Sequence, residues 1–169
     1  GQSYGTNITG TLMLSGKEVR LRTPQEAIRN KLAYVTEDRK GNGLVLSNSI
    51  KINTSLANLD SISNHKVIDK DKEYQVAEEY RGKLKTKCPT VEQNVGNLSG
   101  GNQQKVLLAK WMFTDPDVLI LDEPTRGIDV GAKYEIYCII NDLVAAGKSV
   151  VMISSELPEV LGMSDRIYV

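Results

Sequence analysis

The chain has 169 residues, 40% of them hydrophobic, and its 21 lysines and arginines balance its 21 aspartates and glutamates. This length suits one domain with a sizeable core, or one domain with a subdomain. The charge balance excludes the basic excess that steers proteins to nucleic acid, so we expect no nucleic-acid partner.

Cysteine and histidine usage narrows the chemistry further. Cys88 and Cys138 have no C-x-x-C spacing, which indicates free thiols in a reducing compartment. The only histidine, His65, lies in a polar stretch and is expected at the surface, which argues against a histidine-based triad or metal site. No apolar run approaches the ~20 residues that span a bilayer, and residues 1–20 show no signal-peptide pattern.

The first part of the chain predicts a β-hairpin and a short helix. From Ile8 to Arg22, apolar and polar residues alternate on either side of a Ser15-Gly16 turn. Pro24 ends the second strand, and Thr23 can cap a short helix that runs to Asn30. Lys31 to Thr36 then predicts a strand, followed by the polar turn EDRKGNG.

Residues 47–97 are polar and predict helices. Four residues recur at helical spacing: Tyr74, Ala77, Tyr80 and Leu84. The basic run Lys83, Lys85 and Lys87 is interpreted as a solvated helix face.

The segment from Leu98 to Phe113 predicts a helix with an unusual start. Ser99 can cap this helix, while Gly100 and Gly101 allow another group to approach the backbone. Free N–H groups at such a start suit an anion such as phosphate, although an ordinary capped helix start is the preferred interpretation of these few residues taken alone.

The run VLILDE, Val118 to Glu123, predicts a strand buried on both faces of a parallel sheet. Ligands in such sheets bind at the carboxyl ends of strands, where Asp122 and Glu123 fall. One carboxylate could hold Mg²⁺ and the next could polarise a water. The alternative is two acids in a solvated loop.

The remaining elements extend the α/β pattern. Gly131 to Ala146 predicts a helix, Ser149 to Ser154 a second buried strand, Pro158 the start of a short helix, and Arg166 to Val169 a further strand. The buried helix face is expected to consist of Ile136, Tyr137, Ile140 and Val144. Alternating strands and helices imply a parallel sheet with right-handed crossovers.

The segments LSGGN (98–102) and LILDE (119–123) resemble the signature motif and Walker B of ABC-transporter ATPases, and GID (127–129) lies where that family has its D-loop. EPTRGIDVGAKYEIY together with ISSELPEV resembles the second nucleotide-binding domain of bacterial monosaccharide importers of the ribose, xylose and galactose type. The resemblance covers essentially the whole chain. It implies a P-loop NTPase-like α/β core with a parallel sheet, an N-terminal antiparallel hairpin and an inserted helical subdomain.

The resemblance also implies a division of the single domain. Residues 1–46 would hold the β-subdomain and Q-loop region, 47–114 the helical subdomain with the signature, and 115–169 Walker B and the end of the catalytic core.

Site roles follow from the same resemblance. The signature residues expected to contact the ATP of a partner domain are Ser99, Gly100, Gly101 and Gln103. Asp122 would support Mg²⁺, Glu123 would orient or activate water, and Asp129 would report across a head-to-tail dimer. Glu37 stands at the usual Q-loop glutamine and Ser155 at the usual switch histidine; both departures are familiar in the second domain of these importers and put this half's own hydrolytic site in doubt.

A phosphate-binding P-loop, G-x-x-x-x-G-K-[ST], does not occur in this sequence. Gly16-Lys17 is followed by Glu18, and Gly147-Lys148-Ser149 joins a helix to a strand, which is the wrong order. The sequence therefore looks like a fragment that starts downstream of the P-loop, and the isolated chain is expected to be inactive.

Geometry alone does not decide between two kinds of site. The signature residues and the strand-end acids could form one site within the chain, or each could form part of a composite site shared with a second domain. The helix from Gly101 to Phe113 is roughly 20 Å long, and the strand from Val118 to Asp122 could return by about 16 Å. The composite site rests on the resemblance.

The resemblance implies an ATPase subunit that uses ATP and Mg²⁺ and lies in the cytoplasm on the inner face of the membrane. Its partners would be a second nucleotide-binding domain, membrane permease subunits and, indirectly, a sugar-binding protein. The alternatives are a non-hydrolytic nucleotide-dependent interaction module and a soluble ABC ATPase of DNA repair or translation; the latter predicts coiled-coil insertions or a basic surface, which the sequence lacks.

Overall fold

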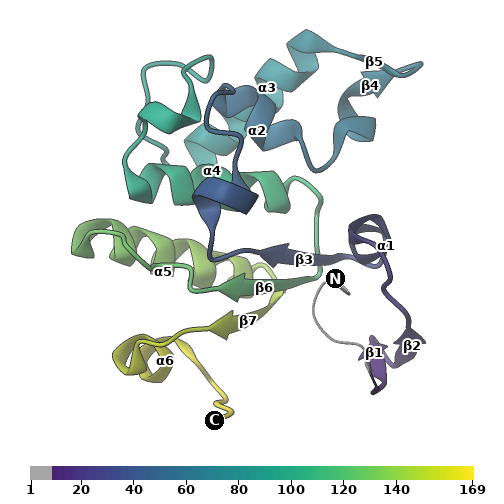
Figure 1. The fold of residues 1–169 in the computed structure, drawn as a ribbon, viewed down its shortest axis with the longest axis vertical. Helices are drawn as coiled ribbons and strands as arrows, with labels where there is room; N and C mark the ends of the chain where they lie inside the picture. The colour runs from purple at the N-terminus through teal and green to yellow at the C-terminus, as the bar shows by residue number, and fades with distance from the viewer. Residues whose placement is uncertain (1–8) are drawn as a thin grey trace.

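A computed structural model describes residues 9–169, so Ile8, the first residue of the expected hairpin, lies outside the described part. Figure 1 shows a three-stranded sheet at the centre, a mainly helical lobe on one side of it, and a small hairpin near the N-terminus. The expected α/β class, with a parallel sheet and an antiparallel N-terminal hairpin, is confirmed.

The hairpin pairs β1 (Leu12–Leu14) with β2 (Lys17–Val19) in antiparallel register. Its two turn residues, Ser15 and Gly16, have φ values of 49° and 75°, as a turn that follows the twist of the strands requires. The short helix α1 (Pro24–Arg29) follows, as expected.

Thr23 caps α1 through a reciprocal capping box with Glu26. The Thr23 side chain accepts a hydrogen bond from the Glu26 N–H over 3.2 Å. The Glu26 carboxylate in turn accepts one from the Thr23 N–H over 3.3 Å. Both contacts satisfy N–H groups that a helix start leaves without intrahelical partners.

The central sheet has the strand order β3-β6-β7, with both pairs parallel. Its strands are β3 (Leu32–Val35), β6 (Val118–Asp122) and β7 (Ser149–Ile153). The middle strand β6 places Leu121 opposite Val35 on one side and Met152 on the other. The parallel neighbours predicted for 118–122 and 149–153 are therefore confirmed.

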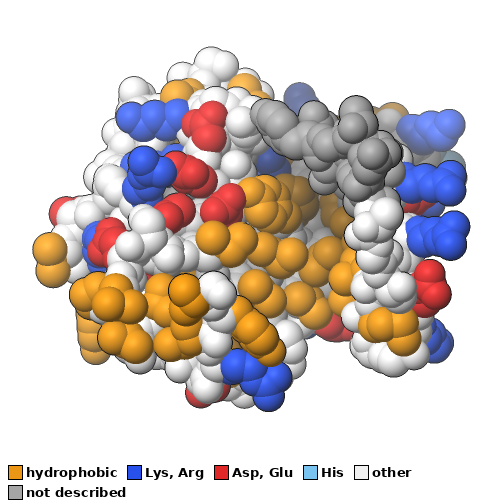
Figure 2. Space-filling model, turned by 60° about the horizontal axis from the view of Figure 1, so that its bottom comes forward, with side chains coloured by type: hydrophobic (Ala, Val, Ile, Leu, Met, Phe, Trp, Pro, Cys, Tyr) orange, Lys and Arg blue, Asp and Glu red, His pale blue; other side chains and the backbone are white. Residues whose placement is uncertain are grey.

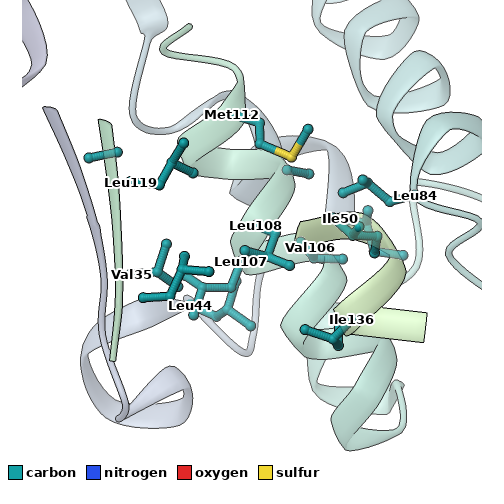
Figure 3. Packing of buried hydrophobic residues seen from close by; sticks show 14 of the residues in the cluster. Val35, Leu44, Ile50, Leu84, Val106, Leu107, Leu108, Met112, Leu119 and Ile136 are labelled. Carbon is teal, nitrogen blue, oxygen red and sulfur yellow. The ribbon is translucent and has the colours of Figure 1, made fainter. Parts of the chain in front are cut away.

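Two long helices, α4 (Gly100–Met112) and α5 (Val130–Ala145), pack against one face of this sheet. Leu107 and Leu108 of α4 are fully buried, as is Leu119 of β6, and Figure 3 shows α4 residues meeting strand residues in the core. This packing fixes where α4 begins relative to the strand ends.

The opposite sheet face is not covered by the described residues. Tyr34 is 47% exposed, Val151 50% and Ile153 47%. The expectation that both strands are buried on both faces is therefore wrong for residues 9–169, because α4 and α5 cover one face only. Hydrophobic side chains gather over much of the face shown in Figure 2.

The lobe formed by residues 47–97, here called the helical lobe, contains the two helices α2 (Ile50–Ser55) and α3 (Lys70–Lys83). Two 3-10 turns, η2 (Leu59–Ile62) and η3 (Val95–Asn97), complete its helical content. On α3, Ala77 is buried and Tyr74 is 41% exposed.

The sequence did not predict a small hairpin in this lobe, β4 (Ser63–Asn64) paired with β5 (Val67–Ile68). Its turn residues His65 and Lys66 both have positive φ, 51° and 68°. This turn type favours Asn-Gly, which the sequence lacks here, so no local signal marked the hairpin. The polar turn expected after Thr36 is a π-helical turn, η1 (Arg39–Gly43).

Two expectations near the C-terminus need correction. On α5, the buried set is Ile136, Ile139, Ile140 and Leu143, whereas Val144 is 47% exposed. Apolar residues occur on more than one face of α5. The face that packs against α4 and β7 is the one whose residues recur every three or four positions, and this face is therefore buried.

After α6 (Leu157–Met163), residues 164–169 form no strand. Among the described residues, no other strand pairs with this segment to hydrogen-bond it in a ladder. None of the helices within residues 9–169 combines the length and apolarity needed to cross a membrane.

Candidate functional site

The start of α4, together with the residues before it, forms what we call the signature loop (residues 98–102). Ser99 is the N-cap, and its Oγ accepts a hydrogen bond from the Asn102 amide Nδ2 over 2.9 Å. The Asn102 Oδ1 then accepts from the Lys87 backbone N–H over 2.8 Å. Asn102 thus fixes the loop to the segment that follows α3.

The two signature glycines are required by close neighbours. A Cβ at Gly101 would lie 2.5 Å from the Cβ of Ala132, and a Cβ at Gly100 would lie 3.0 Å from Nη2 of Arg39. Neither glycine therefore carries a side chain that could cover its own backbone N–H group. Such N–H groups favour a negatively charged ligand.

A polar pocket of about 260 Å³ opens beside the signature loop. Its lining residues are Lys87, Ser99, Gly101, Asn102, Asp129, Gly131, Ala132 and Glu135. Neither Asp122 nor Glu123 lines it. The chain therefore presents the signature loop and the two strand-end carboxylates as separate groups.

Gln103 lies behind the loop rather than in this pocket. It is 5% exposed, and its amide nitrogen donates to the carbonyl oxygens of Val95 and Leu98 over 3.4 and 3.2 Å. These contacts give Gln103 a role in shaping the loop.

Asp122 ends β6 and contacts Tyr34 of the neighbouring strand. The Tyr34 hydroxyl donates to Oδ2 of Asp122 over 2.5 Å. This hydrogen bond, with burial and the nearby negative charges, raises the pKa of Tyr34 to about 12. No local pattern in the sequence predicts this pairing, which depends on the register of β3 against β6.

Glu123 is held by backbone groups of the β7 end. Its N–H donates to the Ile153 carbonyl over 2.8 Å, and its Oε1 accepts from the Ser155 N–H over 2.8 Å. Its φ of 46° lies in the left-handed region, which non-glycine residues occupy at a cost that surrounding contacts must offset. The expected catalytic carboxylate is therefore constrained in both backbone and side chain.

Ser155 contributes its backbone to this contact, not its hydroxyl. Every residue except proline has a backbone N–H. The hydrogen bond to Glu123 therefore does not depend on whether the side chain at position 155 is serine or histidine.

Two side-chain links join the segment after β3 to what we call the strand-end turn (residues 122–129). Glu37 forms an ion pair with Arg126. Arg39 donates from Nη1 to the Arg126 carbonyl over 2.9 Å and from Nη2 to the Gly127 carbonyl over 3.4 Å. Burial lowers the pKa of the Arg39 guanidinium. The sequence did not single out Arg39, which lies between the signature loop and the strand-end turn.

Asp129 caps α5: its Oδ1 accepts from the Ala132 N–H over 2.9 Å. The residue is exposed and lines the pocket beside the signature loop. The structure thus brings Asp129 together with Ser99 and Gly101.

Asp122 could be one ligand of a magnesium ion, but the described residues do not supply a full set of protein ligands. No group of three or more His, Cys, Asp or Glu that could hold a metal occurs within residues 9–169. Mg²⁺ is ordinarily held by one or two carboxylates together with waters and substrate phosphates. Asp122, at a strand end and only partly buried, suits the protein share of such a site.

The sequence of residues 4–126 matches the ABC transporter family model. The chain is similar to the L-arabinose transport ATP-binding protein AraG of Geobacillus stearothermophilus, with 58% identity over 100% of this chain and 33% of the relative. It is also similar to the xylose import ATP-binding protein XylG of Thermoanaerobacter pseudethanolicus, with 55% identity over 95% of this chain and 32% of the relative. The ribose import ATP-binding protein RbsA of Bacillus cereus shows 52% identity over 95% of this chain and 32% of the relative.

Solved structures share the fold. A nucleotide-free ATP-binding cassette from an ABC transporter superposes with a TM-score of 0.78 at 21% identity, covering 93% of this chain and 64% of that one. A dimeric ATP-binding cassette bound to ADP and Pi gives 0.68 at 19% identity, covering 86% and 62%.

The chain spans about a third of the length of the curated relatives it matches. The family match covers most of the chain, and the fold and the signature and strand-end motifs agree with it. This chain belongs to the ABC transporter family.

Proposed function

We propose that this chain is part of an ATP-binding subunit that powers monosaccharide import. The support is the similarity, over nearly the whole chain, to relatives named for L-arabinose, xylose and ribose transport. Because those relatives are about three times longer, the activity is assigned to the whole protein that contains these residues.

The observation that carries the proposal is the separation of the two site halves. The pocket beside the signature loop is lined by neither Asp122 nor Glu123. A head-to-tail pair of nucleotide-binding domains would let each signature loop complete the site of its partner. In that arrangement this chain's signature loop serves the partner's ATP, while its strand-end acids serve its own side.

Each residue then has a chemical role. Ser99 and the N–H groups of Gly100 and Gly101 donate hydrogen bonds to phosphate oxygens, where the helix dipole also favours negative charge. Gln103 holds these donors in place from behind. Asp129, at the edge of the same pocket, contacts the partner domain.

On the strand-end side, Asp122 would hold magnesium, and Glu123 would orient the attacking water and accept its proton. Bound ATP and Mg²⁺ supply the phosphoanhydride and the neutralising charge. Glu37, ion-paired to Arg126, stands where the family's glutamine would lie and links the turn after β3 to this site.

The partners proposed are a second nucleotide-binding domain, permease subunits and, through the permease, a sugar-binding protein. The subunit would lie at the inner face of the cell membrane. Its exposed helical lobe is the part proposed to touch the permease.

Reconstitution of the full-length protein with its permease in proteoliposomes tests the proposal. Uptake of labelled L-arabinose, xylose, ribose and galactose should depend on ATP. Glu123→Gln should lower ATP turnover, whereas Asp142→Asn, at an exposed aspartate of α5 outside both site halves and the helical lobe, should leave it unchanged. ATP-independent uptake, or unchanged turnover in Glu123→Gln, would refute the assignment.

A further inference from the structure

We propose that Glu159 is a positioning residue for ATP hydrolysis, which holds Glu123 in place through the two turns on either side of it. This inference rests on the function proposed above. It concerns a residue that neither the signature nor the strand-end motif contains.

Glu159 lies on α6 and is only 5% exposed. Its Oε1 accepts a hydrogen bond from the Thr125 hydroxyl over 2.7 Å, and its Oε2 accepts one from the Ser154 hydroxyl. Burying a carboxyl group is costly unless its oxygens are hydrogen-bonded, and both oxygens here have a donor.

The two hydroxyl donors flank the catalytic contact. Thr125 follows Glu123 by two residues in the strand-end turn, and Ser154 directly precedes Ser155. Ser155 in turn donates its N–H to Oε1 of Glu123 over 2.8 Å. The contacts therefore close a ring that runs from Glu123 through Thr125, Glu159 and the turn at Ser154-Ser155, and back to Glu123.

This ring controls a residue in an unfavourable backbone conformation. Glu123 has a φ of 46°, so it depends on neighbouring contacts to stay there. The Ser154 Oγ also accepts from the Glu156 N–H over 3.1 Å, which fixes the start of α6 to the same turn. Without Glu159, the strand-end turn and the 154–155 turn lose their shared side-chain anchor.

Glu159→Ala in the full-length protein should lower kcat about 10- to 100-fold, because small displacements of a catalytic group are costly for the chemical step. The KM for ATP should change less than about 3-fold, since Glu159 touches no group proposed to bind phosphate. Glu159→Gln keeps the size and one accepting oxygen, so it should recover part of kcat.

A double-substitution cycle separates positioning from general damage. If Glu159 acts through Glu123, adding Glu159→Ala to Glu123→Gln should cost less than about 2-fold more in single-turnover rate. Amide hydrogen exchange of the peptide containing Ser155 should also accelerate in Glu159→Ala, because its hydrogen bond to Glu123 weakens. If Glu159→Ala does not fold, Thr125→Val removes one hydroxyl donor and should show the same kcat loss and non-additivity.

Asp165→Asn is the matched control, because it removes the charge of an exposed acid two residues after α6 that is not part of the ring. Because an exposed side chain outside the ring anchors neither turn, the kcat of this control should stay within about 2-fold of the parent. Parent-like kcat in Glu159→Ala, or losses that multiply with Glu123→Gln, would overturn this inference. Parent-like kcat in Glu123→Gln alone would instead overturn the proposed function.

Discussion

The N–H of Ser155 donates to Oε1 of Glu123 over 2.8 Å, across 32 residues of sequence. The carboxylate that directly follows the middle strand is thus oriented by the backbone just after the end of the neighbouring strand. Parallel strands in register bring their carboxyl ends together, and here Asp122 pairs directly with Ile153. The sheet itself therefore builds the strand-end half of the site.

Ser99→Arg in the full-length protein should abolish most ATPase activity. The bulky cation would stand where the Gly100 and Gly101 N–H groups are open to a phosphate. The lost cap costs only about 1 kcal/mol, so the protein should stay folded by circular dichroism. Asn97→Arg, an exposed position two residues upstream, adds the same charge and should retain activity. Equal losses in both variants would mean that charge, and not the signature loop, is responsible.

Gly101→Ala should destabilise the fold, because the new Cβ would lie 2.5 Å from the Cβ of Ala132. Overpacking of this kind costs about 1–3 kcal/mol, measurable by urea unfolding. Gly82→Ala is the control: its Cβ would meet nothing within 4 Å, so this substitution in α3 should stabilise by about 0.5–1 kcal/mol. Adding Ala132→Gly to Gly101→Ala should restore stability, and failure to do so would contradict the steric explanation.

Much of this architecture could be predicted from local pattern. The apolar run before Asp122 predicts β6, and Thr23 before Pro24 predicts the start of α1, because each depends on neighbours in sequence. Arg39 and Glu159 could not be found this way, since their contacts with the strand-end turn span 87 and 34 residues. Only the sheet register and the placement of α6 bring these side chains to the strand-end turn.

The Tyr80 phenol should lose its proton at a higher pH than an exposed tyrosine does. Burial, reinforced by the charges of Glu79 and Asp115, raises its pKa from 10.0 to about 12. Since the folded pKa exceeds the unfolded value, the stability that the neutral phenol contributes is complete below about pH 10 and is lost as pH rises towards 12. Tyr80→Phe should therefore show a shallower loss of unfolding free energy across this interval. Identical alkaline profiles for both proteins would contradict the shift.

The helical lobe should exchange its amide hydrogens faster than β6. Its helix α2 buries polar residues, among them Asn53 and Thr54, whereas β6 buries Leu119 and Leu121 between two strands. Segments with fewer apolar contacts open at lower free energy. Exchange followed by mass spectrometry on peptides from 47–97 and 118–122 tests this; equal or stronger protection in the lobe would contradict it.

The contact between Gly101 and Ala132 has a mechanical consequence. The two helices lie so close that a Cβ added at Gly101 would be 2.5 Å from that of Ala132, and the buried Lys105 amine, 2.8 Å from the Glu135 carboxylate, joins the same two helices one turn further on. Packed interfaces shift in discrete steps rather than deform continuously. Ser99 and Asp129, at the starts of these two helices, should therefore move together as one rigid body when an opposing domain approaches or leaves.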